Sequence, residues 1–146
     1  MDLAARLAQD GVRRGAGGPF GAVIVCDGAV IAAEHNRVLE TNDPTAHAEI
    51  LAIRAAAVAL ERPHLHGCEL VTTCEPCPMC LAAAHWAHID RITYAMTRFE
   101  AAAIGFDDVA IHDAMAAPAV PLVHHPHEES AIAFALWAAK DDRIQY

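Results

Sequence analysis

The sequence predicts an α/β protein, a three-layer α/β/α sandwich around a five-stranded mixed sheet. Two observations lead to this class. Short apolar runs typical of strands alternate along the 146 residues with longer runs rich in Ala, Leu and Ile that are typical of helices. The first two strand-like runs are joined by a tight turn, whereas the later ones are separated by helices. We therefore expect one antiparallel pair, followed by strands connected through helical crossovers.

The N-terminal part of the chain is predicted to hold a helix and a β-hairpin. Leucine and valine recur at helical spacing over residues 3–12, and the Gly-rich run at 15–18 ends that helix. Two apolar runs follow at residues 20–25 and 29–33. The Asp27-Gly28 pair between them is a good hairpin signal.

The remaining elements alternate helix and strand. Asp43 or Thr45 is expected to cap a helix over residues 46–60, and the Glu75-Pro76 pair to open another that ends near His88. Further strands are predicted at residues 69–73, 91–96 and 120–123, and a closing helix at 131–140. No repeat or long linker marks a boundary, so the chain is expected to form one domain over residues 1–146.

Composition and charge restrict the function. The chain carries 19 Asp and Glu against 10 Lys and Arg, a formal net charge of −9. A field of this sign repels phosphate backbones and anionic membranes, which disfavours a nucleic-acid partner but leaves room for a local basic patch. The N-terminus has an acidic residue where an export signal needs positive charge, and no uninterrupted apolar run is long enough to span a membrane. We expect a cytoplasmic protein.

The cysteines indicate metal or redox chemistry. Three of the five lie within residues 74–80, which is typical of a reducing compartment and not of a disulfide framework. Cys26 and Cys68 lie apart from this group, and we expect them to be small buried apolar residues.

Two segments, His47-Ala48-Glu49 and Cys77-Pro78-Met79-Cys80, form the candidate metal site. Residues three apart on a helix are neighbours, so Cys77 and Cys80 can face one ion, and zinc accepts thiolate and imidazole ligands. Helices that follow neighbouring strands would bring His47 to the same sheet edge. Three ligands leave a fourth position for water, whose pKa zinc lowers toward about 7. Glu49 is two residues after His47, so its side chain projects in a different direction from the metal ligand. It is predicted to take up and release the protons of that water.

Other interpretations of these residues remain open. A Cys-x-x-Cys pair at a helix start is also the thioredoxin-type redox motif. A structural zinc site would need a fourth ligand, for which Cys74 is the candidate. Taken alone, Glu49 would be an ordinary surface acid near a helix start.

The pattern H-x-E followed by P-C-x-x-C is the signature of zinc-dependent nucleobase deaminases. Over residues 17–146 the chain resembles the cytidine deaminase superfamily, and within it the bacterial guanine deaminases. The similar segments include residues 17–23, 42–49 and 74–80. The zinc motif is common to the superfamily, whereas the Gly-Phe-Asp-Asp stretch at 105–108 and the C-terminal Tyr146 resemble the guanine branch. The resemblance implies a cytidine deaminase-like fold, a Zn²⁺ cofactor, a small nucleobase substrate and a homodimer.

The resemblance also implies which residues contact the base. Asn36 would hydrogen-bond the base edge, although it could simply serve a turn. Phe20 would form an apolar wall of the pocket, or belong to the plain core. Trp86 would line the same pocket, or only pack an Ala-rich helix.

Two further roles follow from the same resemblance. Asp108 would be a second acid near the leaving amine and share proton transfer with Glu49, although spacing does not distinguish it from Asp107. Either acid could instead serve a solvated loop or a helix cap. Tyr146 would close the pocket of the partner subunit through an exchanged C-terminal segment at about residues 128–146, whereas a terminal residue is otherwise usually frayed.

The predicted function is hydrolytic deamination of a free base, guanine to xanthine plus ammonia. Deamination of cytosine, nucleosides or triazines is the alternative within the superfamily, and the Ala-rich stretch at 101–103 could reshape the pocket in that direction. A tRNA adenosine deaminase shares the zinc motif but would need a basic face. Glu49 and the missing fourth ligand disfavour a non-catalytic zinc-binding module. The His-rich stretch at 124–129 matches no motif; it could bind adventitious metal, but it is expected to be a solvated loop.

Overall fold

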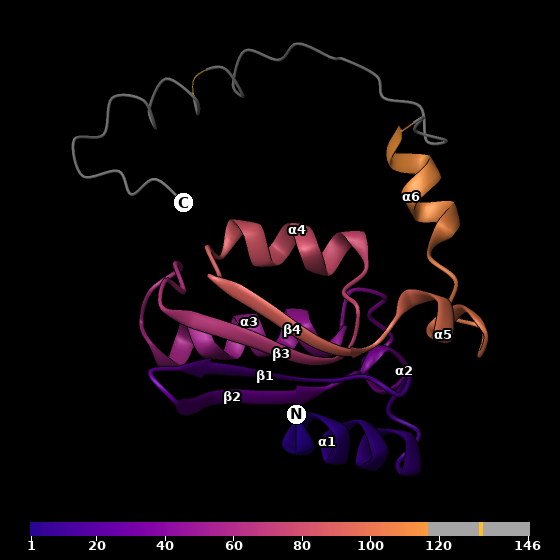
Figure 1. Cartoon of the computed structure of the whole chain (residues 1–146), viewed down its shortest axis with the longest axis horizontal. Helices are drawn as coiled ribbons and strands as arrows, with labels where there is room; N and C mark the ends of the chain where they lie inside the picture. The colour runs from indigo at the N-terminus through magenta and orange to yellow at the C-terminus, as the bar shows by residue number, and fades with distance from the viewer. Residues whose placement is uncertain (117–131, 133–146) are drawn as a thin grey trace.

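The computed structural model describes residues 1–116 and residue 132 (Figure 1). Its helices are α1 (Asp2–Arg13), α2 (Val38–Thr41), α3 (Ala48–Ala59), α4 (Pro78–Trp86), α5 (Arg98–Ala102) and α6 (Val109–Ala116). Its strands are β1 (Gly21–Cys26), β2 (Ala29–His35), β3 (Cys68–Cys74) and β4 (Arg91–Met96). The predicted strand at 120–123, the closing helix, the His-rich stretch and Tyr146 lie outside the described residues. None of the described helices is both long and apolar enough to cross a membrane.

The described strands form one mixed sheet in the order β2-β1-β3-β4. β1 is antiparallel to both of its neighbours, and β3 is parallel to β4. The predicted antiparallel pair and helical crossovers are therefore confirmed, with four strands in the described part of the chain. Because β2, β3 and β4 run in the same direction, their carboxyl ends meet at one edge of the sheet. The segments that follow these three strands build the site described below.

The β1–β2 hairpin forms as its turn residues predict. Asp27 has a φ of 51° and Gly28 a φ of 78°, so both occupy the left-handed region that a two-residue type I′ turn requires. Next to the turn Cys26 pairs with Ala29, and a one-residue register shift between Ile24 and Val25 leaves Gly21 paired with His35 at the far end. The alternation of side chains between the two sheet faces follows from that register.

Helices cover the sheet on both faces, as a three-layer sandwich requires. Figure 1 shows α1 and α4 on opposite sides of the sheet. The α3 and α4 side holds the main core, where alternate β1 residues such as Ala22 and Ile24 pack with Ala52 of α3. On the other side α1 lies so close to β1 that a side chain at Gly21 would collide with the carbonyl oxygen of Ala4. Small residues therefore allow the helices to lie close to the sheet on both of its faces.

Helices α3 and α4 begin two or three residues later than their sequences predict. α3 starts at Ala48 and α4 at Pro78, so His47 and Cys77 are their N-cap residues. Asp43 does not cap α3. Its Oδ1 accepts hydrogen bonds from the backbone N–H and the hydroxyl of Thr45, at 2.8 and 2.7 Å. This local Asx turn competes with the helix and delays its start.

Cys26 and Cys68 are buried as predicted, but they are not free thiols. They form a disulfide between β1 and β3. The two residues are direct partners in the β1–β3 ladder, with Cα atoms 4.2 Å apart, so the sheet register itself brings the sulfur atoms together. The cysteine pattern, interpreted as metal or redox chemistry and not as a disulfide framework, did not predict this bond.

Candidate active site

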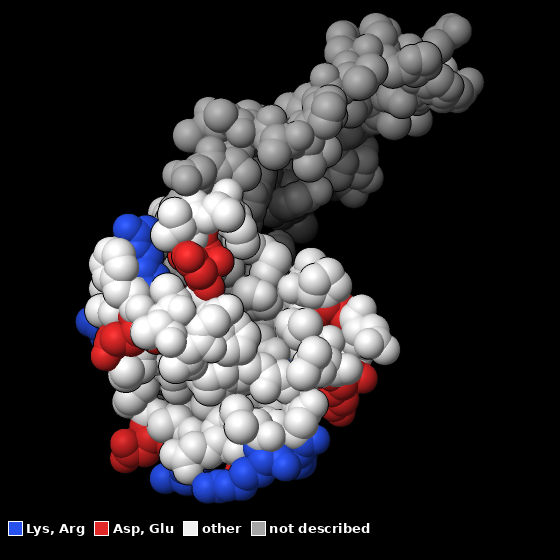
Figure 2. Space-filling view, turned by 90° about the vertical axis from the view of Figure 1, so that its right-hand side faces the viewer, with Lys and Arg blue, Asp and Glu red and all other residues white. Residues whose placement is uncertain are grey.

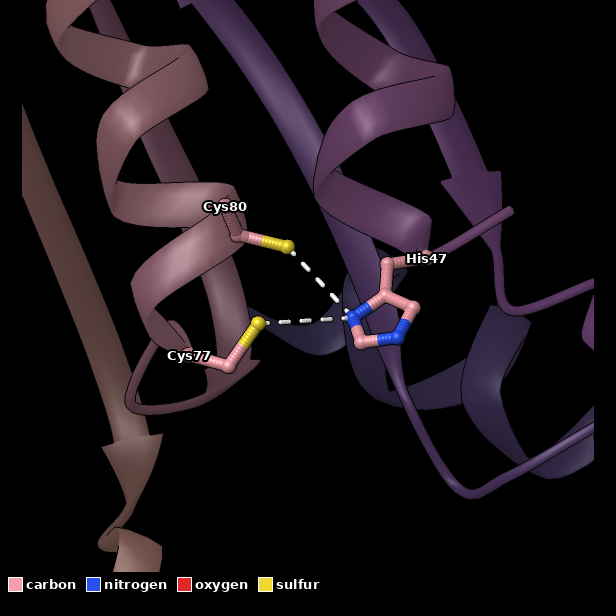
Figure 3. Close-up of side chains that lie close together, drawn as sticks. All are labelled: His47, Cys77 and Cys80. Carbon is pink, nitrogen blue, oxygen red and sulfur yellow. Dashed lines mark hydrogen bonds between the residues drawn. The ribbon is translucent and has the colours of Figure 1, made fainter. Parts of the chain in front are cut away.

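Three side chains converge at the carboxyl edge of the sheet, in front of the α3 and α4 N-termini. His47 is the N-cap of α3, Cys77 is the N-cap of α4, and Cys80 lies one turn inside α4. Neither N-cap side chain makes a capping hydrogen bond. As Figure 3 shows, the imidazole of His47 points instead at both sulfur atoms. The crossover topology thus joins ligands that are 30 or more residues apart in sequence.

The geometry of these three side chains fits tetrahedral zinc. His47 Nδ1 lies 3.6 Å from Cys77 Sγ and 3.5 Å from Cys80 Sγ, and the three ligand atoms all lie within 4.8 Å of one another. A tetrahedral ion with bonds of about 2.1 Å to nitrogen and about 2.3 Å to sulfur separates such atoms by roughly 3.6 Å. The arrangement can therefore accept the ion without rebuilding the site.

The electrostatics of the group favour a divalent cation. The hydrogen bond with Cys80, followed by His47, lowers the pKa of Cys77 to about 4. The same contact with Cys77, together with burial, raises the pKa of Cys80 above its usual range. The hydrogen bond to Cys77 raises the pKa of His47 as well. Because two neighbouring thiolates repel each other, both ionise together only beside a cation, which is the role of zinc.

Glu49 lies beside this group without belonging to it. It occupies the first turn of α3 and is only 4% exposed. Its Oε1 accepts a hydrogen bond from the hydroxyl of Thr72 at 3.3 Å, and its Oε2 accepts one from the thiol of Cys80 at 3.6 Å. Burial raises the pKa of the Glu49 carboxyl. A buried carboxyl with a raised pKa is suited to taking and giving protons near neutral pH.

A cavity of about 600 Å³ opens over the group. His47, Glu49 and Cys77 lie in its wall, and most of the other lining residues come from the segments that flank β1, β2 and β4. These include Gly17, Gly18, Phe20, Asn36, Val38, Leu39, Pro44, Arg98, Ala101, Phe106, Asp107 and Asp108. The volume is sufficient for a purine or pyrimidine base, since small-molecule pockets typically measure 300–1,000 Å³.

Asn36 and Phe20, which the family resemblance placed at the base, both line the cavity. Oδ1 of the buried Asn36 accepts from the backbone N–H groups of Gly18 and Val38, each at 3.2 Å, and this pair of bonds orients the amide. Phe20 packs against the core and also meets Phe106 edge to face, with ring centroids 4.9 Å apart. Each residue therefore has a structural contact as well as its place in the cavity wall. Asn36 bonds to the backbone of neighbouring loops, and Phe20 packs against the core.

Asp107 and Asp108 both line the cavity, but their environments differ. Oδ1 of the exposed Asp107 accepts from the backbone N–H of Val109 at 2.9 Å, so it closes the turn at the start of α6. Asp108 is partly buried, and its charge is among the causes that raise the pKa of Cys74. The structure therefore separates an exposed, turn-forming acid from a partly buried one whose charge acts on Cys74.

Two predicted roles are not supported by the positions of the residues. Trp86 is 67% exposed at the C-terminal end of α4, the end away from the zinc ligands, and it does not line the cavity. Only the N-terminal end of its helix, through Cys77, borders the cavity, and Trp86 lies at the opposite end. Cys74 is not a fourth ligand, because its thiol donates to the backbone oxygen of Thr97. Tyr146 is outside the described residues.

Sequence reasoning missed several residues of the site. Thr72, fully buried beneath Glu49, is the clearest. It occupies an inward position of β3, whose residues alternate between buried and partly buried along the strand. A buried hydroxyl needs a hydrogen-bond partner. A threonine at an inward position of a predicted strand was therefore a signal, present in the sequence, that a polar group lies next to it. Leu39 and Arg98 gave no such signal, because α2 and α5 are too short to show periodicity.

The chain is similar to known deaminases over its whole length. Residues 1–96 match the cytidine and deoxycytidylate deaminase zinc-binding region. Guanine deaminase of Bacillus subtilis is 45% identical over 150 aligned residues, which cover 100% of this chain and 96% of that protein. The X-ray structure of guanine deaminase from Bacillus subtilis matches with a TM-score of 0.92 and 44% identity, covering 99% of this chain and 95% of that one.

A second similarity is partial. The tRNA-specific adenosine deaminase of Agrobacterium fabrum is 54% identical over 76 residues, which cover 52% of this chain and 50% of that protein. The zinc-binding region is thus common to relatives with different substrates, whereas similarity over the full length is to guanine deaminase. With its His-Cys-Cys group and its buried glutamate, this chain belongs to the zinc-binding cytidine and deoxycytidylate deaminase family.

Proposed function

We propose that the protein is a zinc-dependent aminohydrolase that converts guanine and water to xanthine and ammonia. One observation carries the chemistry: the buried Glu49 lies beside a His47–Cys77–Cys80 group in the wall of a base-sized cavity. The substrate is inferred from the similarity to guanine deaminase, which covers the whole chain. We propose His47, Cys77 and Cys80 as the zinc ligands.

Glu49 is the proton carrier in this proposal. Zinc, when bound, supplies Lewis-acid chemistry by lowering the pKa of a water ligand toward about 7. Glu49 takes the two protons of the attacking water in turn, delivering the first to the ring nitrogen and the second to the amino group. The bond between carbon and the amino nitrogen breaks, and ammonia leaves. The hydroxyl of Thr72 holds the carboxyl of Glu49 in place for these transfers.

Asn36, Phe20 and Asp108 are proposed to recognise the base. Backbone N–H groups occupy Oδ1 of Asn36, so its side-chain amino group is the part of the amide suited to bonding an acceptor on the base edge. Phe20 supplies an apolar wall for the ring. Asp108, partly buried at the cavity, is proposed as the second acid near the leaving amine.

Deamination of adenosine in tRNA is the second candidate, and the partial similarity to tRNA-specific adenosine deaminase favours it. The charge distribution argues against it. Figure 2 views the end of the molecule that carries α5 and α6, and its Arg side chains lie along the lower rim and at one upper side, separated by uncharged and acidic surface. With a net charge of −9, such a face gives a phosphate backbone little to bind.

Ammonia release from a panel of substrates tests the function. Guanine should be deaminated faster than cytosine, cytidine, adenine or a tRNA, because a site that hydrogen-bonds one base edge rejects bases that leave its groups unpaired. The Glu49→Gln variant, assayed in parallel, controls for contaminating deaminases. Faster turnover of cytosine or a nucleoside would overturn the substrate and leave the chemistry standing. Turnover of tRNA alone would support the second candidate.

The assembly belongs to the same proposal. We propose a single domain over residues 1–146 that forms a cytoplasmic homodimer, in which a C-terminal segment at about 128–146 is exchanged and Tyr146 closes the partner's site. Similarity to guanine deaminase over the whole chain supports a role for this segment. No contact with nucleic acid is part of the proposal.

A further inference from the structure

Three histidines cluster at the end of the sheet opposite the cavity. His64 and His66 precede β3, and His88 lies in the turn between α4 and β4. Ring centroids are 4.6 Å apart for His64 and His88, 4.9 Å for His66 and His88, and 5.8 Å for His64 and His66. Among the described residues only the cavity group has all its ligand atoms within 4.8 Å of one another. The three rings are close, but their side chains must rotate before one nitrogen of each can lie about 2.1 Å from a common ion.

The backbone fixes the two segments that carry these rings. The N–H of Leu65 donates to the carbonyl oxygen of Ala87 at 2.7 Å, and both residues are buried. The guanidinium of Arg62 donates to the carbonyl oxygen of His66 at 3.1 Å. His64, His66 and His88 therefore project from a common frame, which reduces the entropy lost when a ligand orders their side chains.

One ring nitrogen within the group has no protein partner. Nε2 of His64 is buried and makes no hydrogen bond in the described part of the chain. Leaving a buried polar atom unpaired is costly, so such an atom calls for a specific ion or water molecule. A metal ion bonds to the lone pair of an imidazole nitrogen and would satisfy it.

Asp90 completes the arrangement. Its Oδ1 lies 4.0 Å from Nδ1 of His66, and its Oδ2 accepts from the backbone N–H of Gly67 at 3.0 Å. Metal-binding histidines commonly direct their second ring nitrogen to a carboxylate, which sets the tautomer and orients the ring. Asp90 is placed to do this for His66 and would leave Nε2 of that ring for the ion.

We propose that His64, His66 and His88 form a second metal site, separate from the zinc site of the cavity, that takes one divalent ion of the nickel, copper or zinc class. Imidazole donors select these ions over magnesium and calcium, which prefer oxygen. The rings of His66 and His88 are exposed, so solvent ions can reach them and the rings can turn. The bound ion would join the segment before β3 to the turn before β4 and stabilise the fold.

Nickel binding to the zinc-loaded full-length protein, without an affinity tag, tests the proposal. The protein is dialysed against increasing Ni²⁺ near pH 7.5, and both metals are counted per chain. We expect one Ni²⁺ besides the retained Zn²⁺. His66→Gln should weaken nickel binding by at least about tenfold, and the triple variant His64→Gln, His66→Gln, His88→Asn should abolish it. Asn suits position 88 because the backbone there has a φ of 51°.

The His-rich stretch at 124–129 provides the matched control. Replacing His124, His125 and His127 with Gln should leave the nickel stoichiometry and affinity unchanged, whereas loss of binding there would overturn the proposal. Wild-type nickel binding by the triple variant would also overturn it. Saturating Ni²⁺ should raise the unfolding midpoint of the wild type by about 5 °C and leave that of the triple variant unchanged. If the triple variant loses its zinc and does not fold, the test rests on the exposed His66→Gln change alone, and unchanged nickel affinity in that variant would overturn the proposal.

Discussion

The two ends of the sheet each carry a glutamate, and the pKa values of the two carboxyl groups are shifted in opposite directions. Glu49, at the cavity end, is buried, and that burial raises its pKa. Glu69, at the start of β3, accepts hydrogen bonds from Arg91 and Thr93 of β4, which lower its pKa from 4.5 to about 2. The same residue type is thus prepared to accept a proton at one end and to stay charged at the other.

The difference shows what each end is organised to do. Burial of an ionisable group with few partners disfavours its charged form, which destabilises the folded protein and is retained where proton transfer is needed. A partly exposed carboxylate bonded to the neighbouring strand stabilises the strand pair slightly and does not line the cavity. We therefore expect a substitution of Glu49 to reduce activity and a substitution of Glu69 to affect only stability.

The largest expected effect is on turnover when Glu49 is replaced by Gln. The amide keeps the size of the side chain but cannot carry a proton, so kcat should fall by 10²–10⁴-fold. Zinc should remain at about one ion per chain, because Glu49 is not a ligand. Steady-state ammonia release and metal analysis of the same sample provide the measurement.

Glu69→Gln is the matched control, the same change at the other end of the sheet. It should leave kcat within about twofold of the wild type, because Glu69 does not line the cavity. Near-normal activity in the Glu49 variant would show that another residue, with Asp108 the first to test, is the principal base. Loss of zinc in that variant would instead mean that Glu49 helps to hold the metal.

An intermediate effect is expected at Thr72, which carries no charge and contacts no cavity space. Thr72→Val removes the hydroxyl that donates to Glu49 while preserving side-chain shape. We expect kcat to fall about tenfold, the equivalent of one hydrogen bond of about 1.4 kcal/mol, with KM nearly unchanged. Thr72→Ser should retain most of the activity. If Val and Ser behave alike in kcat, the hydroxyl does not position Glu49.

The smallest effect is expected on stability at Glu69. Because solvent screens this pair, Glu69→Gln should cost less than about 1 kcal/mol of unfolding free energy in urea at pH 7. The folded-state pKa is lowered, so the stabilisation is present above pH 4.5 and is lost as pH falls toward 2. The stability difference between wild type and variant should therefore shrink over that interval. A difference independent of pH would mean that the carboxylate charge contributes nothing.

Much of the fold follows from local patterns. The β1–β2 hairpin depends on Asp27-Gly28, whose backbone preference is intrinsic, and the strands depend on alternation within a few residues. The zinc group is predictable for a similar reason, because the His-x-Glu and Cys-x-x-Cys spacings each place their side chains within one helical turn.

The features that the sequence did not predict have one local cause and two long-range causes. The helix starts shifted because a turn centred on Asp43 competes with capping of α3. The Cys26–Cys68 disulfide depends on the register of two strands 42 residues apart in sequence. The position of Trp86 depends on where α4 begins relative to the cavity, which composition does not reveal. The disulfide and the position of Trp86 need the assembled sheet, whereas the start of α3 depends on a competition between two local hydrogen-bonding patterns.

The two N-cap positions of α3 and α4 create an evolutionary trade-off. His47 and Cys77 leave the first backbone N–H groups of their helices without a side-chain cap. Serine, aspartate or asparagine at such positions typically stabilises a helix by about 1 kcal/mol relative to a non-capping residue. A single drift from Cys77 to serine would remove a metal ligand and strengthen the helix at once. At these two positions metal binding therefore takes the place of helix capping, and the stability that a cap would give must come from the bound ion instead.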